Sequence, residues 1–377
     1  MKLLWFIPTY GDSRYIGSSI GARDTSYDYL KQVAQAVDHL GYYGALLPTG
    51  RTCEDAWVIA SALATETKNM KFLVAVRPGL TLPSVSARMA ATLDRISNGR
   101  LLVNVVAGGD PVELASDGIF HTHDERYTIT DEFLDIWRKL SMEEDQFSYE
   151  GHHYKVENSN LFLKSKQRPY PELYFGGSSS AGQAVAINHA DVYLTWGEPP
   201  AQVAEKINQM KALAKNHGRT LRFGIRLHVV VRETEAEAWQ VAHDLIKHVT
   251  DESIQAALQV FKRFDSEGQK RMTELHQGRK DQLEISPNLW AGIGLLRGGA
   301  GTAIVGSPEI VAARIKEYQD LGIEEFIFSG YPHLEEAYRF AELVFPLLNY
   351  PQQTDKKEIH TPYVSPFGEI KAAVDRI

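Results

Sequence analysis

The segment LLWFIPTYG, residues 3–11, joins a short apolar strand pattern to a turn that contains a single glycine, Gly11. A dinucleotide-binding fold carries the pattern G-x-G-x-x-G at its first turn, and this chain does not. An open, doubly wound sheet is therefore disfavoured. The number of further strand patterns indicates which other α/β fold the chain adopts. We predict eight strands: Leu3–Ile7, Gly44–Leu47, Phe72–Val76, Leu101–Val106, Glu172–Phe175, Val192–Thr195, Phe223–Val231 and Phe326–Ser329.

Patterns with helical periodicity lie between these strands, as expected for βα units and a parallel sheet. The predicted helices include Tyr27–Leu40, Asp55–Thr65, Ser84–Ser97, Ile129–Leu140, Pro200–Asn216, Ser307–Leu321 and Leu334–Leu348. Eight parallel strands are the number that closes a TIM barrel. We therefore expect an α/β protein with a single (β/α)8 TIM barrel over residues 1–349.

Two connections are longer than ordinary βα loops. Residues 107–126 follow the fourth strand, and residues 234–301 follow the seventh. The second connection holds two helical patterns and then the glycine-rich segment WAGIGLLRGGAGT, which contains Arg297. Connections of this length are typical of lids or binding elements, and we predict a lid around Arg297. Residues 350–377 show little periodicity, which predicts either a disordered tail or an arm that docks on a neighbouring subunit.

The composition excludes several classes of function. The chain has 377 residues, 44% of them hydrophobic, and a formal net charge of −8, which supplies no large basic field for nucleic acid. Cys53 is the only cysteine, so no intrachain disulfide can form. No segment has the length of a membrane span or the pattern of a signal peptide, and no cluster has zinc-ligand spacing. We expect a soluble, cytoplasmic protein without a metal site.

Active sites of TIM barrels lie at the carboxyl ends of the strands. The segment FGGSSS, Phe175–Ser180, follows the fifth strand and combines glycines, serine hydroxyls and a following helix, which suit a phosphate group. A plain glycine turn with serine caps is the alternative. His123 and Tyr127 share a helical face if a helix begins there, with a surface histidine and a half-buried tyrosine as the alternative.

Arg226 and His228 lie two residues apart in the predicted strand Phe223–Val231, so we expect their side chains on the same face. An arginine at the mouth of a barrel needs either an acidic partner or an anionic ligand. We favour the anionic ligand, and Arg297 in the glycine-rich loop is a candidate second contact.

Long segments of the chain are similar to the FMNH2-dependent alkanesulfonate monooxygenases of the bacterial luciferase-like superfamily, and to the closely related methanesulfonate monooxygenases. The segments that carry this resemblance are WFIPTYGD, GYYGALLPTGRTCEDAW, ATLDRISNGR, PYPELYFGGSS, DVYLTWGEPP, RFGIRLHVVVRET, EISPNLWAGIGLLRGGAGTAIVG and SGYPHLEEAYR. The resemblance implies a two-component monooxygenase, which receives reduced FMN from a separate NAD(P)H-dependent FMN reductase. With O2 it would cleave the C–S bond of an alkanesulfonate to an aldehyde and sulfite, as a homodimer or homotetramer.

The resemblance also implies a role for individual residues of this chain. The catalytic residues would be Arg226, His228, Arg297 and Tyr331. The two arginines would hold the sulfonate and the flavin oxygen adduct, while His228 and Tyr331 would supply hydrogen bonds or protons. The substrate would contact Trp196, Arg226, Arg297, Tyr331 and Tyr10. The flavin would contact Asn104, Tyr127, Gly177, Ser178, Ser179 and Cys53.

One residue departs from the pattern of the family. The family commonly reads Pro-Thr-His-Gly-Asp after strand one, and this chain has Tyr10 in place of the histidine. Because tyrosine is bulkier, the preferred chain length of the sulfonate stays open. Oxidation of an alkane, aldehyde or amine on the same scaffold would need no arginine cluster. A flavin-binding barrel without turnover would show a broken set of site residues.

Overall fold

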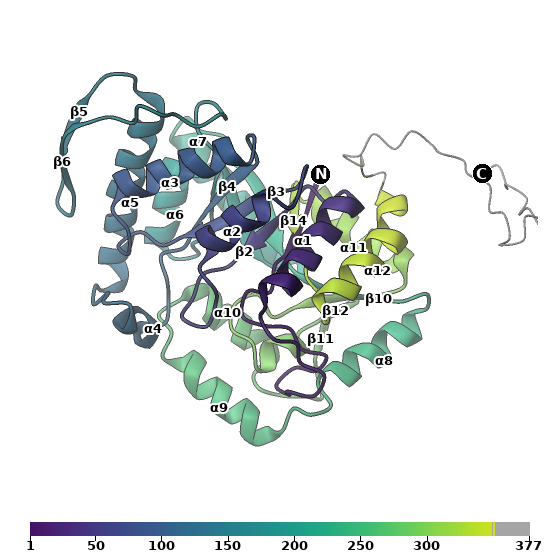
Figure 1. Cartoon of the computed structure of the whole chain (residues 1–377). Coiled ribbons are helices and arrows are strands. Elements are labelled where there is room, and N and C mark those ends of the chain that lie inside the picture. The colour runs from purple at the N-terminus through teal and green to yellow at the C-terminus, as the bar shows by residue number, and fades with distance from the viewer. Residues whose placement is uncertain (349, 351–377) are drawn as a thin grey trace, which may run out of the picture.

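The structure, a computed structural model, describes residues 1–348 and 350. Its centre is a closed barrel of eight parallel strands in the order β1-β14-β9-β8-β7-β4-β3-β2 (Figure 1). These strands are β1 (Lys2–Phe6), β2 (Gly44–Leu47), β3 (Lys71–Val76), β4 (Leu101–Val105), β7 (Leu173–Phe175), β8 (Val192–Trp196), β9 (Arg222–Arg226) and β14 (Glu325–Ile327). The predicted TIM barrel is therefore confirmed. The predicted tail from residue 351 onward lies outside the described residues.

Helices connect the strands and cover the outside of the barrel. They are α1 (Tyr27–Leu40), α2 (Ala56–Ala64), α3 (Pro83–Ile96), α5 (His123–Met142), α6 (Ser180–His189), α7 (Pro200–Asn216), α11 (Pro308–Asp320) and α12 (His333–Val344), with a 3-10 turn η2 (Phe345–Leu348). The α1 helix begins where Ser26 accepts a hydrogen bond from the Tyr29 amide, and it ends at Gly41, whose φ of 85° favours glycine. The α5 helix starts earlier than the predicted Ile129, because Thr122 forms a capping box with Glu125.

The interior of the barrel is filled by alternate residues of the strands. Leu4 and Phe6 of β1 point inward and pack with Leu73, Leu102 and Tyr174, among others. The intervening residues of β1 pack outward against the helices. This alternation follows from the two-residue period of a strand, and it places Phe6 at the carboxyl end of the barrel interior.

The predicted single strand Phe223–Val231 is wrong. The β9 strand ends at Arg226, and β10 (His228–Val231) belongs to a second, four-stranded sheet with β13 (Ala303–Gly306), β12 (Leu289–Trp290) and β11 (Glu284–Ser286). The chain leaves the barrel at Leu227, whose amide still donates to the carbonyl of Ile327 at 3.0 Å. Arg226 and His228 therefore do not share the face of one strand, and their proximity has another cause.

The two long connections carry structure of their own. Residues 107–126 contain α4 (Pro111–Ser116) and the first turn of α5. Residues 234–301 contain α8 (Glu235–Leu245), α9 (Asp251–Lys262), α10 (Glu267–His276), β11, β12 and the 3-10 turn η1 (Gly292–Leu295), so three helices are present where two were expected. A hairpin that was not predicted, β5 (Phe147–Glu150) with β6 (Lys155–Ser159), follows α5. Figure 1 shows α9 and α10 at the end of the barrel away from the N-terminus.

Arginine–carboxylate pairs fasten the second connection to the barrel loops. The pairs are Arg263 with Asp110, Arg126 with Asp265, and Arg271 with Glu198, at N···O distances from 2.6 to 2.8 Å. Two-point pairs of this kind fix orientation as well as distance. The link between α9 and α10 and the start of α10 are thereby held against the loops that follow β4 and β8. Among the helices that the structure describes, none has the length and the apolar composition of a membrane span.

Candidate active site

Arg226 ends β9 with a buried positive charge. Its guanidinium carbon lies 4.8 Å from the centre of the Phe6 ring. It donates to the Ser329 hydroxyl at 2.7 Å, to the carbonyl of Ile327 at 3.3 Å and to the carbonyl of Leu227. None of these acceptors carries a charge. Burial lowers the pKa of Arg226 to about 9, and the charge of Arg297 also lowers it, so the group stays protonated at neutral pH.

Arg297 brings a second guanidinium group to the same ring. Its guanidinium carbon lies 5.7 Å from the centre of Phe6 and 5.9 Å from that of Tyr10. The side chain donates to the carbonyls of Gly298 and Ala300, each at 3.1 Å, and so is held by its own loop. Burial opposes the charge, but the nearby hydroxyls of Tyr10 and Tyr331 outweigh it and raise the pKa of Arg297.

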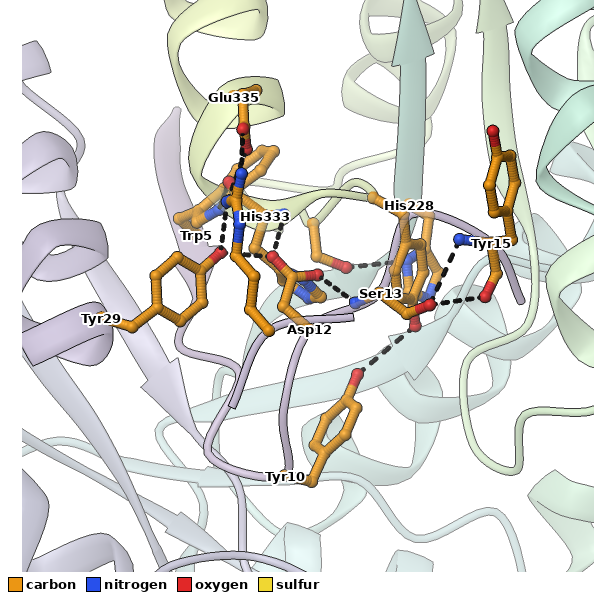
Figure 2. A network of polar contacts seen from close by, with 12 residues as sticks. Trp5, Tyr10, Asp12, Ser13, Tyr15, Tyr29, His228, His333 and Glu335 are labelled. Carbon is orange, nitrogen blue, oxygen red and sulfur yellow. Dashed lines mark hydrogen bonds and ion pairs between the residues drawn. The ribbon is translucent and has the colours of Figure 1, made fainter. Parts of the chain in front are cut away.

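Two tyrosine hydroxyls meet beside the arginines. The hydroxyl oxygens of Tyr10 and Tyr331 lie 3.3 Å apart (Figure 2). Tyr331 is buried, and burial together with Tyr10 raises its pKa, although Arg297 opposes the rise. Tyr331 therefore stays a neutral hydroxyl that can donate a hydrogen bond. The structure brings Arg226, Arg297, Tyr10 and Tyr331 together, as the sequence analysis expected of one pocket.

His228 lies next to this pocket with both ring nitrogens in use. Its Nε2 lies 3.0 Å from the carbonyl oxygen of Ala300, which can only accept, so Nε2 carries the hydrogen. Burial and the charges of Arg226 and Arg297 hold the pKa of His228 well below its usual range. The neutral Nδ1 therefore accepts from the Ser329 hydroxyl at 2.7 Å. His228 has no free nitrogen for a proton transfer in this arrangement.

A second group of predicted residues surrounds the start of α6. The Ser179 hydroxyl accepts from the Gly182 amide at 3.2 Å and caps the helix. A Cβ on Gly177 would lie 2.8 Å from the Gly182 Cα, so only glycine lets the loop pack this closely. The Tyr127 ring lies beside Gly182 of the same turn, and burial raises the pKa of Tyr127. The free amides of a helix N-terminus, serine hydroxyls and a tyrosine suit a phosphate.

Comparison with known proteins identifies the family of the chain. Residues 1–325 match the family model described as luciferase-like monooxygenase. The chain belongs to the luciferase-like monooxygenase family. Members of this family are flavin-dependent monooxygenases, so the chain is an oxidoreductase of this class.

Several solved structures share the luciferase-like fold at low sequence identity. A long-chain alkane monooxygenase superposes with a TM-score of 0.77 at 20% identity, over 93% of this chain and 91% of that chain. A riboflavin lyase with modified FMN and riboflavin has a TM-score of 0.75 at 21% identity, over 93% and 91%. An EDTA monooxygenase from Chelativorans sp. BNC1 has a TM-score of 0.74 at 19% identity, over 93% and 95%. Identities this low show the fold alone.

The other predicted residues of this luciferase-like monooxygenase lie around the two groups. Trp196 ends β8 beside Arg226, and a Cβ on Gly268 of α10 would lie 3.0 Å from its ring. Asn104 of β4 is half-buried and pairs in register with Tyr174 of β7. The β7 strand leads into the loop before α6 that holds Gly177, Ser178 and Ser179. Cys53 is half-buried, and burial raises the pKa of its thiol, which favours the neutral form.

Four residues of the site were given no role from the sequence: Phe6, Asp12, Ser329 and His333. The alternation of residues along β1 could have identified Phe6, because Leu4 and Phe6 point into the barrel while the residues between them face the helices. The other three follow the ends of β1 and β14, at the carboxyl end of the barrel, but no local pattern reports which residues they contact. Their partners are more than 100 residues away, apart from Tyr29 and Ser13 beside Asp12. Across the described residues, no three His, Cys, Asp or Glu side chains form a group that could hold a metal ion.

Proposed function

We propose that this protein is a two-component, FMNH2-dependent alkanesulfonate monooxygenase. In this proposal it uses reduced FMN and O2 to cleave the C–S bond of an alkanesulfonate, giving an aldehyde and sulfite. An NAD(P)H-dependent FMN reductase supplies the reduced flavin. A methanesulfonate-preferring enzyme of the same type is the second candidate, favoured by the bulk of Tyr10 at the pocket. A cytoplasmic location and assembly as a homodimer or homotetramer stay predictions.

The observation that carries the proposal is the unpaired charge of Arg226. Three arginines are buried in the described part of the chain: Arg77, Arg126 and Arg226. Arg77 and Arg126 each pair with a carboxylate, whereas the acceptors around Arg226 are two carbonyls and a hydroxyl. A buried charge without a counter-ion is unfavourable unless an anionic ligand completes the site. The nearby guanidinium of Arg297 adds a second positive charge, which increases the need for an anionic ligand.

A sulfonate fits the donors that surround these charges. It is a strong-acid anion with three acceptor oxygens, which two guanidinium groups and a pair of hydroxyls can share. Arg226 is held by its bonds to neutral acceptors, so its position does not depend on the ligand. Tyr331 and Tyr10 are placed to donate to the same anion, or to the oxygen of the departing sulfite. An alkane or an aldehyde would leave both charges uncompensated.

The residues around α6 fit the phosphate of FMN. Ser178, Ser179 and Tyr127 would contact the phosphate, and Gly177 gives the backbone the close approach that the cradle needs. Asn104 and Cys53 would face the ring system. Bound reduced flavin would supply the activation of O2, while the protein residues bind the anion and exclude water. The α9–α10 segment, fastened by its arginine pairs, is suited to that exclusion.

A coupled assay tests the proposed function. Purified protein, a flavin reductase, NADH and FMN are incubated in air with methanesulfonate, octanesulfonate or octane, and sulfite is measured. Sulfite from at least one sulfonate, dependent on the reductase, is the expected result. Absence of sulfite from both sulfonates, with flavin reduction proven in the same tube, would overturn the proposal.

A further inference from the structure

We infer that Asp12 and His333 act as a positioning pair that joins two catalytic loops and sets the distance between the Tyr10 and Tyr331 hydroxyls. Both residues lie in segments that carry the family resemblance, Asp12 in WFIPTYGD and His333 in SGYPHLEEAYR, but neither was assigned a role in the site. The inference rests on the proposed function for its substrate, but the positioning itself is a property of this chain.

Asp12 is buried and saturated with donors from two loops. Its carboxylate accepts from the Ser13 amide at 2.9 Å, from the His333 amide at 2.8 Å and from His333 Nδ1 at 2.8 Å, and it also accepts from the Tyr29 hydroxyl (Figure 2). Three of these donors, the two of His333 and the Tyr29 hydroxyl, lie outside the loop that follows β1. A carboxylate with four charge-assisted contacts has little freedom to move.

His333 connects Asp12 to the aromatic residues of the pocket. It is fully buried, and its ring centre lies 4.9 Å from that of Tyr331, 5.8 Å from that of Phe6 and 6.5 Å from that of Tyr10. Its carbonyl accepts from the Trp5 indole at 3.1 Å, which fixes the backbone of the residue as well. The imidazole is therefore held in a fixed position between the three aromatic rings of the pocket.

The Nε2 atom of His333 is buried and has no hydrogen-bond partner among the described residues. A buried polar atom is normally satisfied, so this orphan needs a reason other than stability. The ring that carries this atom lies against Phe6, Tyr10 and Tyr331, the aromatic residues that border the two arginines. His333 therefore contributes the fixed position of its ring, and not an additional hydrogen bond.

Outer contacts support the pair from the surface. Arg23 donates to the Tyr29 hydroxyl at 3.3 Å and to Glu335 of α12 at 2.9 Å. The order Glu335, Arg23, Tyr29, Asp12, His333 thus runs from a half-buried helix face to the pocket (Figure 2). Tyr10 lies two residues before Asp12, and Tyr331 lies two residues before His333, so a fixed distance between the pair fixes the two hydroxyls.

The test compares Asp12→Asn, His333→Gln and the double variant with the wild type. Removing one charge-assisted contact is expected to raise the KM for a sulfonate about tenfold in the coupled assay. Because the two residues act as one unit, the double variant should resemble each single variant rather than show the product of both effects. The Kd for FMN, measured by fluorescence quenching, should stay within twofold of the wild type. Tyr29→Phe should give a smaller increase in KM.

Ser13→Ala is the matched control. The Ser13 hydroxyl bonds only backbone groups of its own loop: it donates to the carbonyls of Tyr15 at 2.7 Å and Ser18 at 2.8 Å and accepts from the Tyr15 amide at 3.2 Å. Its loss therefore disturbs the loop without touching the pair. An unchanged KM in this control is expected. A tenfold rise there, or multiplicative effects in the double variant, would overturn the inference.

A crystal structure of Asp12→Asn separates this inference from the proposed function. The two hydroxyl oxygens, now 3.3 Å apart, should move beyond hydrogen-bond distance. An unmoved pair would refute the positioning role, whatever the substrate. If the wild type releases no sulfite, the proposed function fails. The positioning role of Asp12 and His333 is then tested by the crystal structure alone. A variant that does not fold is replaced by His333→Asn, with the same readouts.

Discussion

His228 accepts a hydrogen bond from Ser329, with Nδ1 and Oγ 2.7 Å apart, while its Nε2 faces the carbonyl of Ala300. The same Ser329 hydroxyl accepts from Arg226. The direction of each bond is fixed, because an arginine can only donate and a carbonyl can only accept. His228 is thereby a neutral support for Arg226, and of the hydrogen bonds or protons that the family resemblance implied for it, this arrangement uses it for hydrogen bonds.

Acidification should destabilise the protein through His228. Its folded pKa lies below the unfolded value of about 6.5, so the unfolded chain binds the proton first as the pH falls. Its contribution to stability is complete above about pH 6.5 and is lost as the pH falls toward the folded pKa, by about 1 kcal/mol from pH 6.5 to 5.5. Urea unfolding at both pH values measures this loss.

In His228→Gln the acid-induced loss should be smaller. It should not vanish, because burial also lowers the pKa of His276 to about 4. Replacing the exposed His217 by Gln is the control and should leave the wild-type pH dependence unchanged. An identical slope in His228→Gln and wild type would contradict the neutral assignment.

Removal of either pocket arginine should abolish sulfite release. Arg297→Ala takes away a guanidinium that lies over Phe6 and Tyr10, and Arg226→Ala takes away the buried one. We expect kcat/KM for the sulfonate to fall at least 100-fold, since about 3 kcal/mol of charge-assisted bonding is lost. The Kd for FMN should change little. Arg279→Ala, at an exposed position, is the matched control; normal sulfite yield from Arg297→Ala would refute the lid role of its loop.

The cradle at α6 predicts discrimination between FMN and riboflavin. Ser178→Ala and Ser179→Ala should weaken FMN binding about tenfold, because each removes a hydroxyl from the phosphate. Riboflavin, which has no phosphate, should bind wild type and variants alike. Fluorescence titration with both flavins gives the comparison, and Ser180→Ala, at an exposed position, serves as control. Equal losses for both flavins would show that the serines do not hold the phosphate.

Tyr10 should limit the length of the substrate. Its ring lies 6.0 Å from Phe6 and occupies the space beside Arg297, so Tyr10→His should enlarge the pocket. We expect the ratio of kcat/KM for octanesulfonate over methanesulfonate to rise about tenfold, in keeping with the several methylene groups that gain contact. Tyr10→Phe keeps the bulk and is the control, with little change in that ratio. A fall of the ratio in Tyr10→His would contradict the size argument.

Glu198→Gln should destabilise the fold and loosen α10. Glu198 is buried and bonds Arg271 at 2.7 and 2.8 Å and Lys206 at 3.1 Å. Losing the carboxylate leaves the buried Lys206 uncompensated, which we expect to cost about 3 kcal/mol or more. Urea unfolding measures it, and Asp320→Asn, which breaks an exposed pair with Lys316, should change stability by about 0.5 kcal/mol or less.

The sequence alone determined the barrel. Eight apolar runs with helical patterns between them can bury their surface only in an α/β arrangement, and the structure confirms the closed barrel. The bounds of the predicted helix Tyr27–Leu40 agree with α1, because its cap at Ser26 and its end at Gly41 depend on residues a few positions apart. Local rules carry this information, so local sequence is sufficient for it.

The break at Leu227 was decided by the tertiary structure. The run Phe223–Val231 is apolar enough for one strand, but β10 pairs with β13, which lies more than 70 residues further along the chain. No periodicity within the run reports that partner. His228 is consequently placed beside Arg226 by Ser329 and Ala300, and the prediction of one shared strand face failed for this reason.

The chemistry of the site divides in the same way. Arg226, Arg297 and Tyr331 were identifiable as residue types at strand ends and in a glycine-rich loop, although their positions relative to Phe6 were not. The missing carboxylate of Arg226, the saturation of His228 and the Asp12–His333 pair depend on contacts between distant segments. Burial and counter-charges are properties of the folded chain, so the sequence supplied the groups, and the tertiary structure decided their charge and their partners.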